Sequence, residues 1–378
     1  MRQVMTGKLP FILEKEDIPD PRLLQELLAR YERDPGLVGE ALGLIWGARR
    51  GLSETELLRL LRPTDLPQLP LAAWSPLRAA LQNAEWLVDR GGILNFAHDS
   101  LRAAVETAFV LGEDRRDELR LQLADDFERQ PISYRSCDEL PWLLFQTESY
   151  QRLRQCLLDI DLFLEINQRD AEELRRYWVD LGEERMMGSL YLASFELWAK
   201  LAHRDENRIS YAANELGLFL SRSGLYAEAE PLVRRVLAID EKSYGPEHTA
   251  VARDLNNLAA LLECTDRLAE AEPLYRRAQI IFEKSLGVDH PDVGTSLNNL
   301  AQVLKKMNRL DEAEPILLRA VQIFLKYTRV TQRLDPRLQM AINNYGGFLE
   351  ATGRSVEEIH IALHGIAPDL YKPMNQGI

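Results

Sequence analysis

The chain has 378 residues, of which 46% are hydrophobic and 28% charged, so it can bury two or three packed domains and is too apolar for long disorder. Its formal net charge of -13 disfavours nonspecific binding to nucleic acid or to an anionic membrane, which depends on clustered lysines and arginines. Three widely separated cysteines, Cys137, Cys156 and Cys264, fit a reducing compartment.

Residues 1–34 are expected to be a separate N-terminal segment. Their first part has no sustained apolar run of the kind found in a signal peptide. No stretch of about 18 apolar residues, the length needed to cross a bilayer, occurs in the chain. We therefore expect a cytoplasmic protein without a membrane partner.

Residues 35–112 are predicted to form a small domain of helices with one hairpin. An apolar helix ends near Trp46, and Ser53 and Glu56 have the spacing of a capping box that opens the next helix. Residues 86–96 alternate in hydropathy about a Gly-Gly pair, which is typical of a hairpin. Three helices followed by a hairpin and a further helix predict a winged-helix-like domain.

Short motifs in this domain resemble the winged-helix segment of signal-transducing NTPases with a NACHT-type core. These motifs are Gly51-Leu52-Ser53-Glu54-x-Glu56-Leu57, Phe96-x-His98-Asp99 and Leu101-Arg102-x-Ala104-Val105. The resemblance implies that His98 and Asp99 sense the β-phosphate of a nucleotide if an NTPase core is present. The other interpretation is that Asp99 caps a helix and His98 packs at its start. The chain itself favours that second interpretation, because it lacks the Gly-x-x-x-x-Gly-Lys-Ser/Thr loop that cradles phosphate.

Residues 113–205 are predicted to form a helical linker domain. The stretches Glu139-Leu140-Pro141-Trp142-x-Leu144 and 153–164 resemble the helical linker of the same NTPases. The resemblance implies that this segment joins the winged-helix-like domain to whatever follows it.

From residue 206 to residue 378 the sequence repeats itself in steps of 42 residues. Ala-Glu-Ala-Glu-Pro-Leu occurs twice and Glu-Ala-Glu-Pro-Ile once, with their prolines at Pro231, Pro273 and Pro315. Such units cannot bury their apolar faces alone, but they form a continuous core when stacked. An insertion of three residues is expected within 327–337, where the pattern is lost. The spacing predicts helix pairs near 209–251, 252–294, 295–339 and 340–366.

These units resemble the tetratricopeptide repeat, in the longer form found in kinesin light chains. The shared markers are Leu-Asn-Asn-Leu-Ala, Glu-Ala-Glu-Pro-Leu and the Gly-x-Asp/Glu-His stretches at 245–248 and 287–290. The resemblance implies a mainly α fold, a right-handed α-solenoid whose first helices line a concave groove. Nephrocystin-type proteins carry such repeats after a winged helix and a linker. The chain therefore resembles the C-terminal part of a nephrocystin-type signal-transducing NTPase with its NTPase core absent; a core, if it exists, lies upstream or on another chain.

One asparagine recurs at the same position of every repeat, although asparagine is a mediocre helix former. A primary amide donates and accepts, so such a ladder can pair with the main chain of an extended peptide. In kinesin light chains the corresponding asparagines contact bound peptide. In this chain Lys305 and Lys306 lie near the asparagines and would favour a partly acidic partner. The competing interpretation is that each asparagine only bonds to the neighbouring repeat and sets the stacking. The expected peptide-binding residues are Asn214, Asn256, Asn257, Asn298, Asn299, Asn343, Asn344, Arg253, Gln302, Lys305 and Lys306.

The function expected from these patterns is that of a non-catalytic scaffold or sensor that holds a protein or an extended peptide. No histidine or cysteine spacing predicts a metal site and no nucleophile–base grouping is visible, so neither an enzyme nor a cofactor is expected. One alternative is a winged-helix transcription regulator with a repeat sensor, but Arg78 is the single basic residue of its candidate recognition helix. The other alternative is a regulatory subunit of an ATPase, with His98 as its nucleotide sensor.

Overall fold

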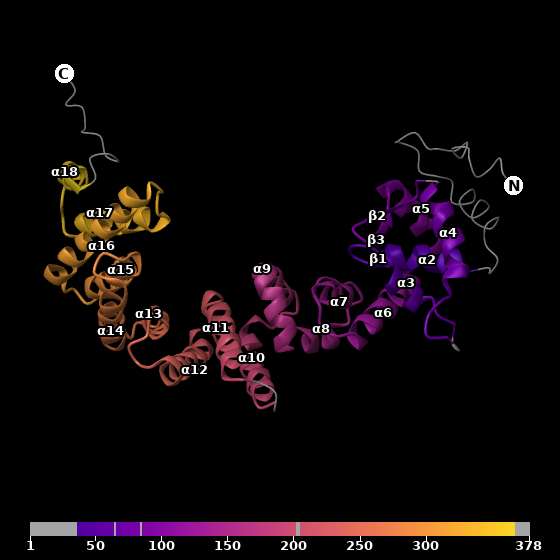
Figure 1. Ribbon diagram of the computed structural model, residues 1–378, viewed down its shortest axis with the longest axis horizontal. Helices are drawn as coiled ribbons and strands as arrows, with labels where there is room; N and C mark the ends of the chain where they lie inside the picture. Colours follow the sequence, from indigo (N-terminus) through magenta and orange to yellow (C-terminus); the bar gives the residue numbers. More distant parts are fainter. Residues whose placement is uncertain (1–35, 64–65, 84, 202–204, 367–378) are drawn as a thin grey trace, which may run out of the picture. The chain divides into compact units, whose positions relative to one another are not determined.

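The structure is a computed structural model that describes residues 36–63, 66–83, 85–201 and 205–366. The chain divides into two compact units, residues 1–184 and 185–378. Figure 1 labels the helices and strands of both. The expected N-terminal segment 1–34 lies outside the described residues. Within the described parts, no helix combines the length and the apolar character that a bilayer-spanning segment requires.

The first part of unit 1 is a small domain of helices and one three-stranded antiparallel sheet of order β1-β3-β2. The expected hairpin is confirmed, with Leu87 opposite Phe96 and Arg90 opposite Ile93. Strand β1 was not predicted. The assignment of this domain to the winged-helix class stays a prediction. Its elements are α2 (Leu37–Gly47), β1 (Leu52–Ser53), α3 (Glu54–Leu60), α4 (Leu71–Asn83), β2 (Leu87–Arg90), β3 (Ile93–Phe96) and α5 (Asp99–Phe109).

Local chemistry explains how β1 and α3 begin. Gly51 has a φ of +89°, and a Cβ at this position would lie 2.2 Å from the carbonyl oxygen of Leu94, so glycine lets the chain approach β3. The predicted capping box is confirmed, because Ser53 Oγ accepts the backbone N–H of Glu56 at 3.2 Å and Glu56 Oε2 accepts that of Ser53 at 2.7 Å.

The second part of unit 1 is helical, and a buried carboxylate ties it to the first part. Glu139 in α7 accepts the backbone N–H groups of Arg49 and Arg50, each at 2.8 Å, in the loop that leads to β1. The boundary between the two units, after Glu184, falls inside the expected linker 113–205. These helices are α6 (Glu113–Arg129), α7 (Tyr134–Gln146), α8 (Tyr150–Leu157) and α9 (Ile160–Asp180).

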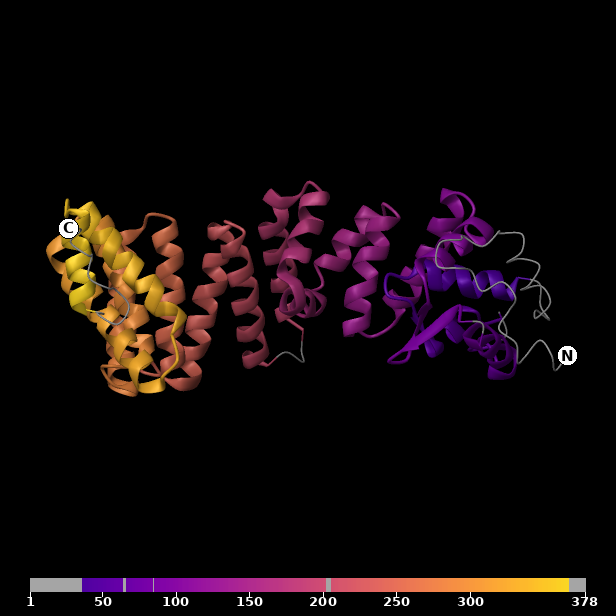
Figure 2. The same ribbon diagram turned by 90° about the horizontal axis from the view of Figure 1, so that it is seen from above.

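Unit 2 contains the four helix pairs that the repeat spacing predicted, preceded by one further helix (Figure 2). Helix α10 begins at Glu184, 42 residues before α12, so it continues the register of the second helices although it lacks the sequence markers of the repeats. The helices are α10 (Glu184–Ala199), α11 (Glu206–Arg222), α12 (Tyr226–Tyr244), α13 (Thr249–Cys264), α14 (Leu268–Leu286), α15 (Pro291–Lys306), α16 (Leu310–Thr331), α17 (Pro336–Ala351) and α18 (Val356–Ile366).

The expected insertion is accommodated by a longer helix. Helix α16 has 22 residues, whereas α12 and α14 have 19 each, and Gln332 ends it in the left-handed conformation with φ of +56°. The extra residues therefore extend the second helix of the third pair before the chain turns into α17. The expected mainly α fold with consecutive helix pairs is confirmed.

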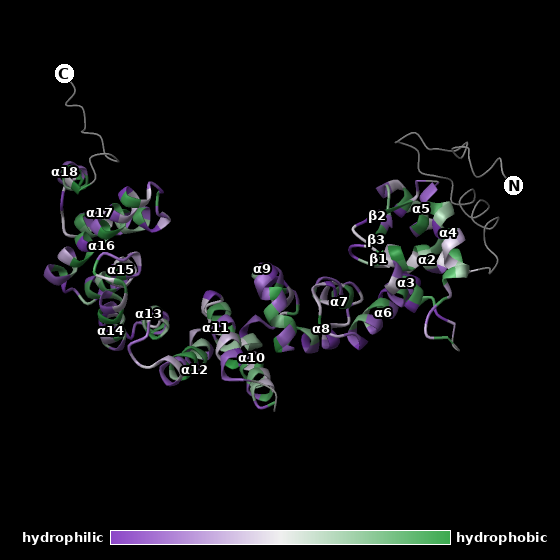
Figure 3. Cartoon of the chain, viewed as in Figure 1, coloured by the Kyte–Doolittle hydropathy of each residue, from purple (hydrophilic) through white to green (hydrophobic). Residues whose placement is uncertain are grey.

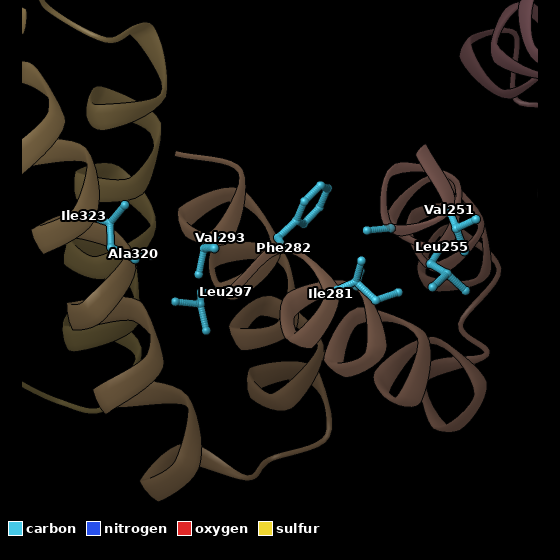
Figure 4. Packing of buried hydrophobic residues seen from close by; sticks show 10 residues of the cluster. Val251, Leu255, Ile281, Phe282, Val293, Leu297, Ala320 and Ile323 are labelled. Atoms are coloured by element: carbon cyan, nitrogen blue, oxygen red, sulfur yellow. The ribbon is translucent and has the colours of Figure 1, made fainter. Parts of the chain in front are cut away.

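The core of unit 2 runs continuously from one helix pair to the next. Apolar and polar residues both occur on the repeat helices (Figure 3). Phe282 and Ile281 of α14 lie between Leu255 of α13 and Leu297 of α15, and all four are at most 5% exposed (Figure 4). This shared packing fixes the positions of α13 and α15, the two helices that line the site described below.

Candidate functional site

A hollow of about 600 Å³ opens between α13, α14 and α15. Two consecutive first helices, α13 and α15, supply its polar walls. Phe282 and Leu286 of α14 contribute apolar surface, together with Ala250 and Ala260 of α13. The remaining lining residues are His248, Thr249, Arg253, Asn256, Asn257, His290, Asp292, Thr295 and Asn299. The hollow therefore combines an apolar patch with hydrogen-bonding groups from two neighbouring repeats.

The recurring first asparagine was expected to face an open groove, and for Asn298 that expectation is wrong. Its residue surface is only 2% exposed. Its Oδ1 accepts a hydrogen bond from Asn344 Nδ2 of α17 at 3.0 Å, and its Nδ2 donates to Asn299 Oδ1 at 3.4 Å. Asn298 is thus enclosed between repeats and bonded to the next one, as the competing stacking interpretation requires. Asn344 is its partner in that contact.

The other first asparagines do not continue a single ladder. Asn256 touches the hollow, but its amide exchanges hydrogen bonds with Ser296 of the next repeat. Asn214 is half-buried and donates to Glu215 Oε1 at 3.2 Å. Asn343 is exposed and accepts from Gln339 Nε2 at 2.9 Å. Neither Asn214 nor Asn343 lines the hollow, so the expectation of one shared row of amides is wrong.

The three residues expected at the far end of α15 also lie outside the hollow. Lys305 Nζ donates to the carbonyl oxygen of Gly347 at 3.2 Å, and Lys306 forms an ion pair with Glu263 at 2.9 Å. The Nε2 of Gln302 is buried and has no hydrogen-bond partner among the described residues. Both lysines therefore hold helices together, and they no longer argue for an acidic partner.

Besides Asn256, three of the expected residues line the hollow, namely Arg253, Asn257 and Asn299. Arg253 and Asn257 lie four residues apart on α13 and therefore share a face of the helix, and Asn299 is the equivalent of Asn257 on α15. Within the part of the chain that the structure describes, Arg253 forms no ion pair and Asn257 forms no hydrogen bond. Asp292, the acidic residue of the lining, is paired with Arg337 at 3.2 Å. The hollow therefore offers hydrogen-bond donors, on Arg253 and Asn257, that have no partner among the described residues.

Sequence reasoning missed two histidines of the lining, His248 and His290. Each precedes a first helix as its N-cap and accepts a backbone N–H through Nδ1. The Gly-x-Asp/Glu-His stretches contained the signal, but they served only as family markers. A role for the two histidines can be recognised only from the structure, because it shows that the starts of α13 and α15 border the same hollow.

Two carboxyl groups near the hollow, on Asp254 of α13 and Asp240 of α12, influence each other. Asp254 of α13 is 4% exposed, and burial together with the nearby Asp240 of α12 raises the pKa of Asp254 to about 7. Its Oδ2 accepts no hydrogen bond from the described residues. This is the expected state of a protonated carboxyl oxygen that donates to Asp240. Ser210 of α11 donates to Asp240 Oδ1 at 3.3 Å.

The residues that motivated the nucleotide and DNA interpretations lie in unit 1. His98 and Asp99 are exposed at the start of α5, where His98 is the N-cap residue without a side-chain capping bond. Their nucleotide-sensing role stays a prediction. Arg78 is paired with Glu54 at 2.7 Å and with Asp89 at 3.0 Å, so it does not present an unpaired charge to DNA. No group of three or more potential ligands is placed to hold a metal within the described ranges.

Comparison with known proteins places the repeats in one family. The profile described as the Nephrocystin-3 TPR domain matches residues 122–342, more than half of the chain. Nephrocystin-3 of Mus musculus is 29% identical over 236 residues, which cover 60% of this chain and 17% of that protein. Nephrocystin-3 of Xenopus laevis is 28% identical over 250 residues, which cover 63% and 18%. The chain thus spans less than a fifth of the length of these relatives.

The chain also matches solved structures, at 20% identity or less in the two that follow. BtubC (BKLC) from P. vanneervenii matches with a TM-score of 0.43 and 20% identity, covering 61% of this chain and 90% of that one. A Signal Transduction ATPase with Numerous Domains protein from Pyrococcus horikoshii, which has a tetratricopeptide repeat sensor, matches with a TM-score of 0.38 and 14% identity. That match covers 94% of this chain and 60% of the other.

Proposed function

Since this chain belongs to the family of the nephrocystin-3 TPR domain, we propose that it is a non-catalytic interaction module that holds a partner polypeptide in the hollow between α13, α14 and α15. The observation that carries this proposal is that one hollow combines an apolar patch with hydrogen-bond donors that have no partner among the described residues. Repeat solenoids of this class commonly use their hollowed surfaces for binding.

The polar part of the hollow fits a main chain. The amides of Asn257 and Asn299 come from equivalent positions of neighbouring repeats, and each lines the hollow. A primary amide can donate to a carbonyl oxygen and accept from an N–H, so two of them can hold an extended segment whatever its side chains are. Arg253 adds a charged donor that suits a carbonyl or carboxylate oxygen.

The apolar part of the hollow supplies the gain from burial. Leu286 is 40% exposed and borders Phe282, which is almost fully packed. Covering the exposed part of Leu286 with an apolar partner side chain removes both surfaces from water, at about 25 cal/mol for each Å² buried. The hollow thus selects for an extended segment that carries at least one apolar side chain.

We propose further that unit 1 connects this module to a signalling NTPase. Support comes from the motifs of the first domain and from the exposed position of His98 and Asp99 at the start of α5. The chain alone is expected not to bind ATP or ADP, because it lacks a phosphate-binding loop. Measurable nucleotide affinity of the isolated chain would favour the ATPase-subunit alternative instead.

The binding proposal is tested by selecting short random peptides on the full chain and measuring the dissociation constant of the most enriched one. Replacing both Asn257 and Asn299 by alanine is expected to weaken binding by about tenfold or more, since each lost hydrogen bond contributes about 1 kcal/mol. Asn343→Ala is the matched control, because Asn343 is a recurring asparagine outside the hollow. The proposal is wrong if no peptide is enriched, or if the control weakens binding equally.

A further inference from the structure

We propose that His248 and His290 contact the bound polypeptide directly, each donating its Nε2–H to a main-chain carbonyl oxygen. This inference rests on the proposed function, because it assigns a role within the same hollow. It identifies the partner by its chemistry as an extended segment that is recognised through its carbonyl oxygens.

The backbone determines which ring nitrogen carries the proton. The Nδ1 of His248 accepts the backbone N–H of Ala250 at 3.2 Å, and the Nδ1 of His290 accepts that of Asp292 at 3.2 Å. The Asp292 carboxylate lies 3.6 Å from His290 Nδ1, beyond hydrogen-bond distance. A nitrogen that accepts a hydrogen bond carries no proton, so the neutral imidazole holds its proton on Nε2. Both rings therefore present a donor on the side away from the helix start.

One of the two rings is also held in place by stacking. His248 stacks on Tyr244 with ring centroids 4.9 Å apart and an interplanar angle of 24°. The two histidines occur at equivalent positions of neighbouring repeats, and both line the hollow. Among the described residues, neither Nε2 forms a hydrogen bond. Two oriented donors, one repeat apart, are thus available to a ligand.

Capping alone does not explain the choice of histidine. The first helices outside the hollow begin with aspartate caps, Asp205 for α11 and Asp335 for α17. Only the two helices that border the hollow, α13 and α15, begin with histidine caps among the four described first helices. Serine, threonine, aspartate and asparagine are the preferred N-caps, and histidine is not among them. What histidine adds to a cap acceptor is the Nε2–H donor.

The donors determine the class of ligand. His248, His290 and Arg253 all donate, whereas the one carboxylate of the lining, Asp292, is paired with Arg337. An excess of donors fits a ligand rich in acceptors, and every residue of an extended polypeptide carries a carbonyl oxygen. The histidines therefore contribute affinity that depends little on the side chains of the partner, while the apolar patch supplies selectivity.

The test separates the donor from the cap. In the double variant His248→Ser/His290→Ser, each serine still accepts the backbone N–H, but the Nε2–H is lost. With the selected peptide as probe, we expect the double variant to remain folded and its dissociation constant to be about tenfold higher. Asp205→Ser, a cap replacement away from the hollow, is expected to leave the dissociation constant unchanged.

Each outcome is decisive. If the peptide binds the double variant as tightly as the wild type while the Asn257 and Asn299 replacements still weaken it, the histidine inference fails and the proposed function stands. If no peptide binds the wild type, the proposed function itself fails. Should the double variant not fold, the proton-coupled ¹⁵N spectrum of the wild-type imidazoles decides: the Nε2–H tautomer with peptide-induced shifts supports the inference, and an Nδ1–H tautomer overturns it.

Discussion

Asn256 of α13 and Ser296 of α15 exchange two hydrogen bonds between neighbouring repeats. Asn256 Nδ2 donates to Ser296 Oγ at 2.7 Å, and Ser296 Oγ donates to Asn256 Oδ1 at 3.0 Å. Ser296 is completely buried, so the pair satisfies groups that water cannot reach. At this step the first asparagine of the pair, Asn256, thus joins neighbouring repeats, while the second, Asn257, lines the hollow.

The first prediction concerns Asn298. Replacing it by alanine leaves the Nδ2 of Asn344 without its partner in a buried contact, which is expected to lower the free energy of unfolding by about 1–3 kcal/mol. Urea denaturation measures the change. Asn343→Ala, at the exposed equivalent position, is expected to stay within about 0.5 kcal/mol of the wild type. Equal midpoints for the two variants would contradict the assignment of Asn298 to stacking.

The second prediction is a pH dependence at Asp254. At one repeat position the second helices carry aromatic residues, namely Trp198, Phe282 and Phe324, whereas α12 carries Asp240. Asp240 lies close to Asp254 of α13. The raised pKa means that the folded state holds a proton which the unfolded state releases. The stabilising contribution of the proton on Asp254 is therefore complete when the pH is below the ordinary aspartate pKa of about 3.9. It is lost as the pH rises through about 7.

An uncharged isostere isolates this effect. Asp254→Asn can still donate to Asp240 but does not titrate. The difference in unfolding free energy between wild type and variant is expected to shift in favour of the variant as the pH rises from about 4 to about 8. A difference that stays constant over this range would show that Asp254 is ionised throughout.

The third prediction concerns Glu139, whose side chain is fully buried. Burial raises the pKa of Glu139, although Arg135 at 2.6 Å and the two backbone donors oppose that effect. Glu139→Ala leaves those donors without an acceptor, and it is expected to cost about 3–5 kcal/mol in the unfolding of unit 1. The exposed Glu172, paired with Arg175 at 2.9 Å, is the control, with an expected cost of about 0–1 kcal/mol for its replacement by alanine. Similar losses in both variants would refute the role of Glu139.

The fourth prediction compares two glycines of unit 1 with positive φ. Gly51→Ala brings a Cβ to 2.2 Å from a backbone oxygen, whereas Gly91, with φ of +64°, has no atom within 4 Å of such a Cβ. Gly91→Ala is expected to cost about 1–2 kcal/mol for the left-handed conformation alone. Gly51→Ala is expected to cost more, because β1 must also move away from β3. Thermal unfolding of both variants measures the difference, and equal midpoints would contradict the close approach.

The repeat period made most of unit 2 predictable from sequence. Helix pairs of fixed length recur whenever the markers recur, so their existence and order follow from spacing alone. Helix α10 escaped because it has the register of a second helix without the Glu-Ala-Glu-Pro marker. Strand β1 has two residues, too few to produce a detectable alternation.

The site was less predictable, because a helical wheel gives the direction of a side chain but not the neighbour that it meets. Asn298 and Asn299 are adjacent in sequence, yet the first is enclosed by α17 and the second lines the hollow. Lys305 likewise reaches Gly347 of the next repeat. Only the packing between repeats decides which polar groups form hydrogen bonds with the neighbouring repeat and which stay accessible to a partner.

Amide hydrogen exchange of the full chain, with and without the selected peptide, tests the central claim most directly. If the hollow holds the polypeptide, peptide binding slows exchange in the two segments that supply its polar walls, 248–260 and 290–299. Slowed exchange confined to unit 1, or to α16–α18, with these two segments unchanged, would contradict the account.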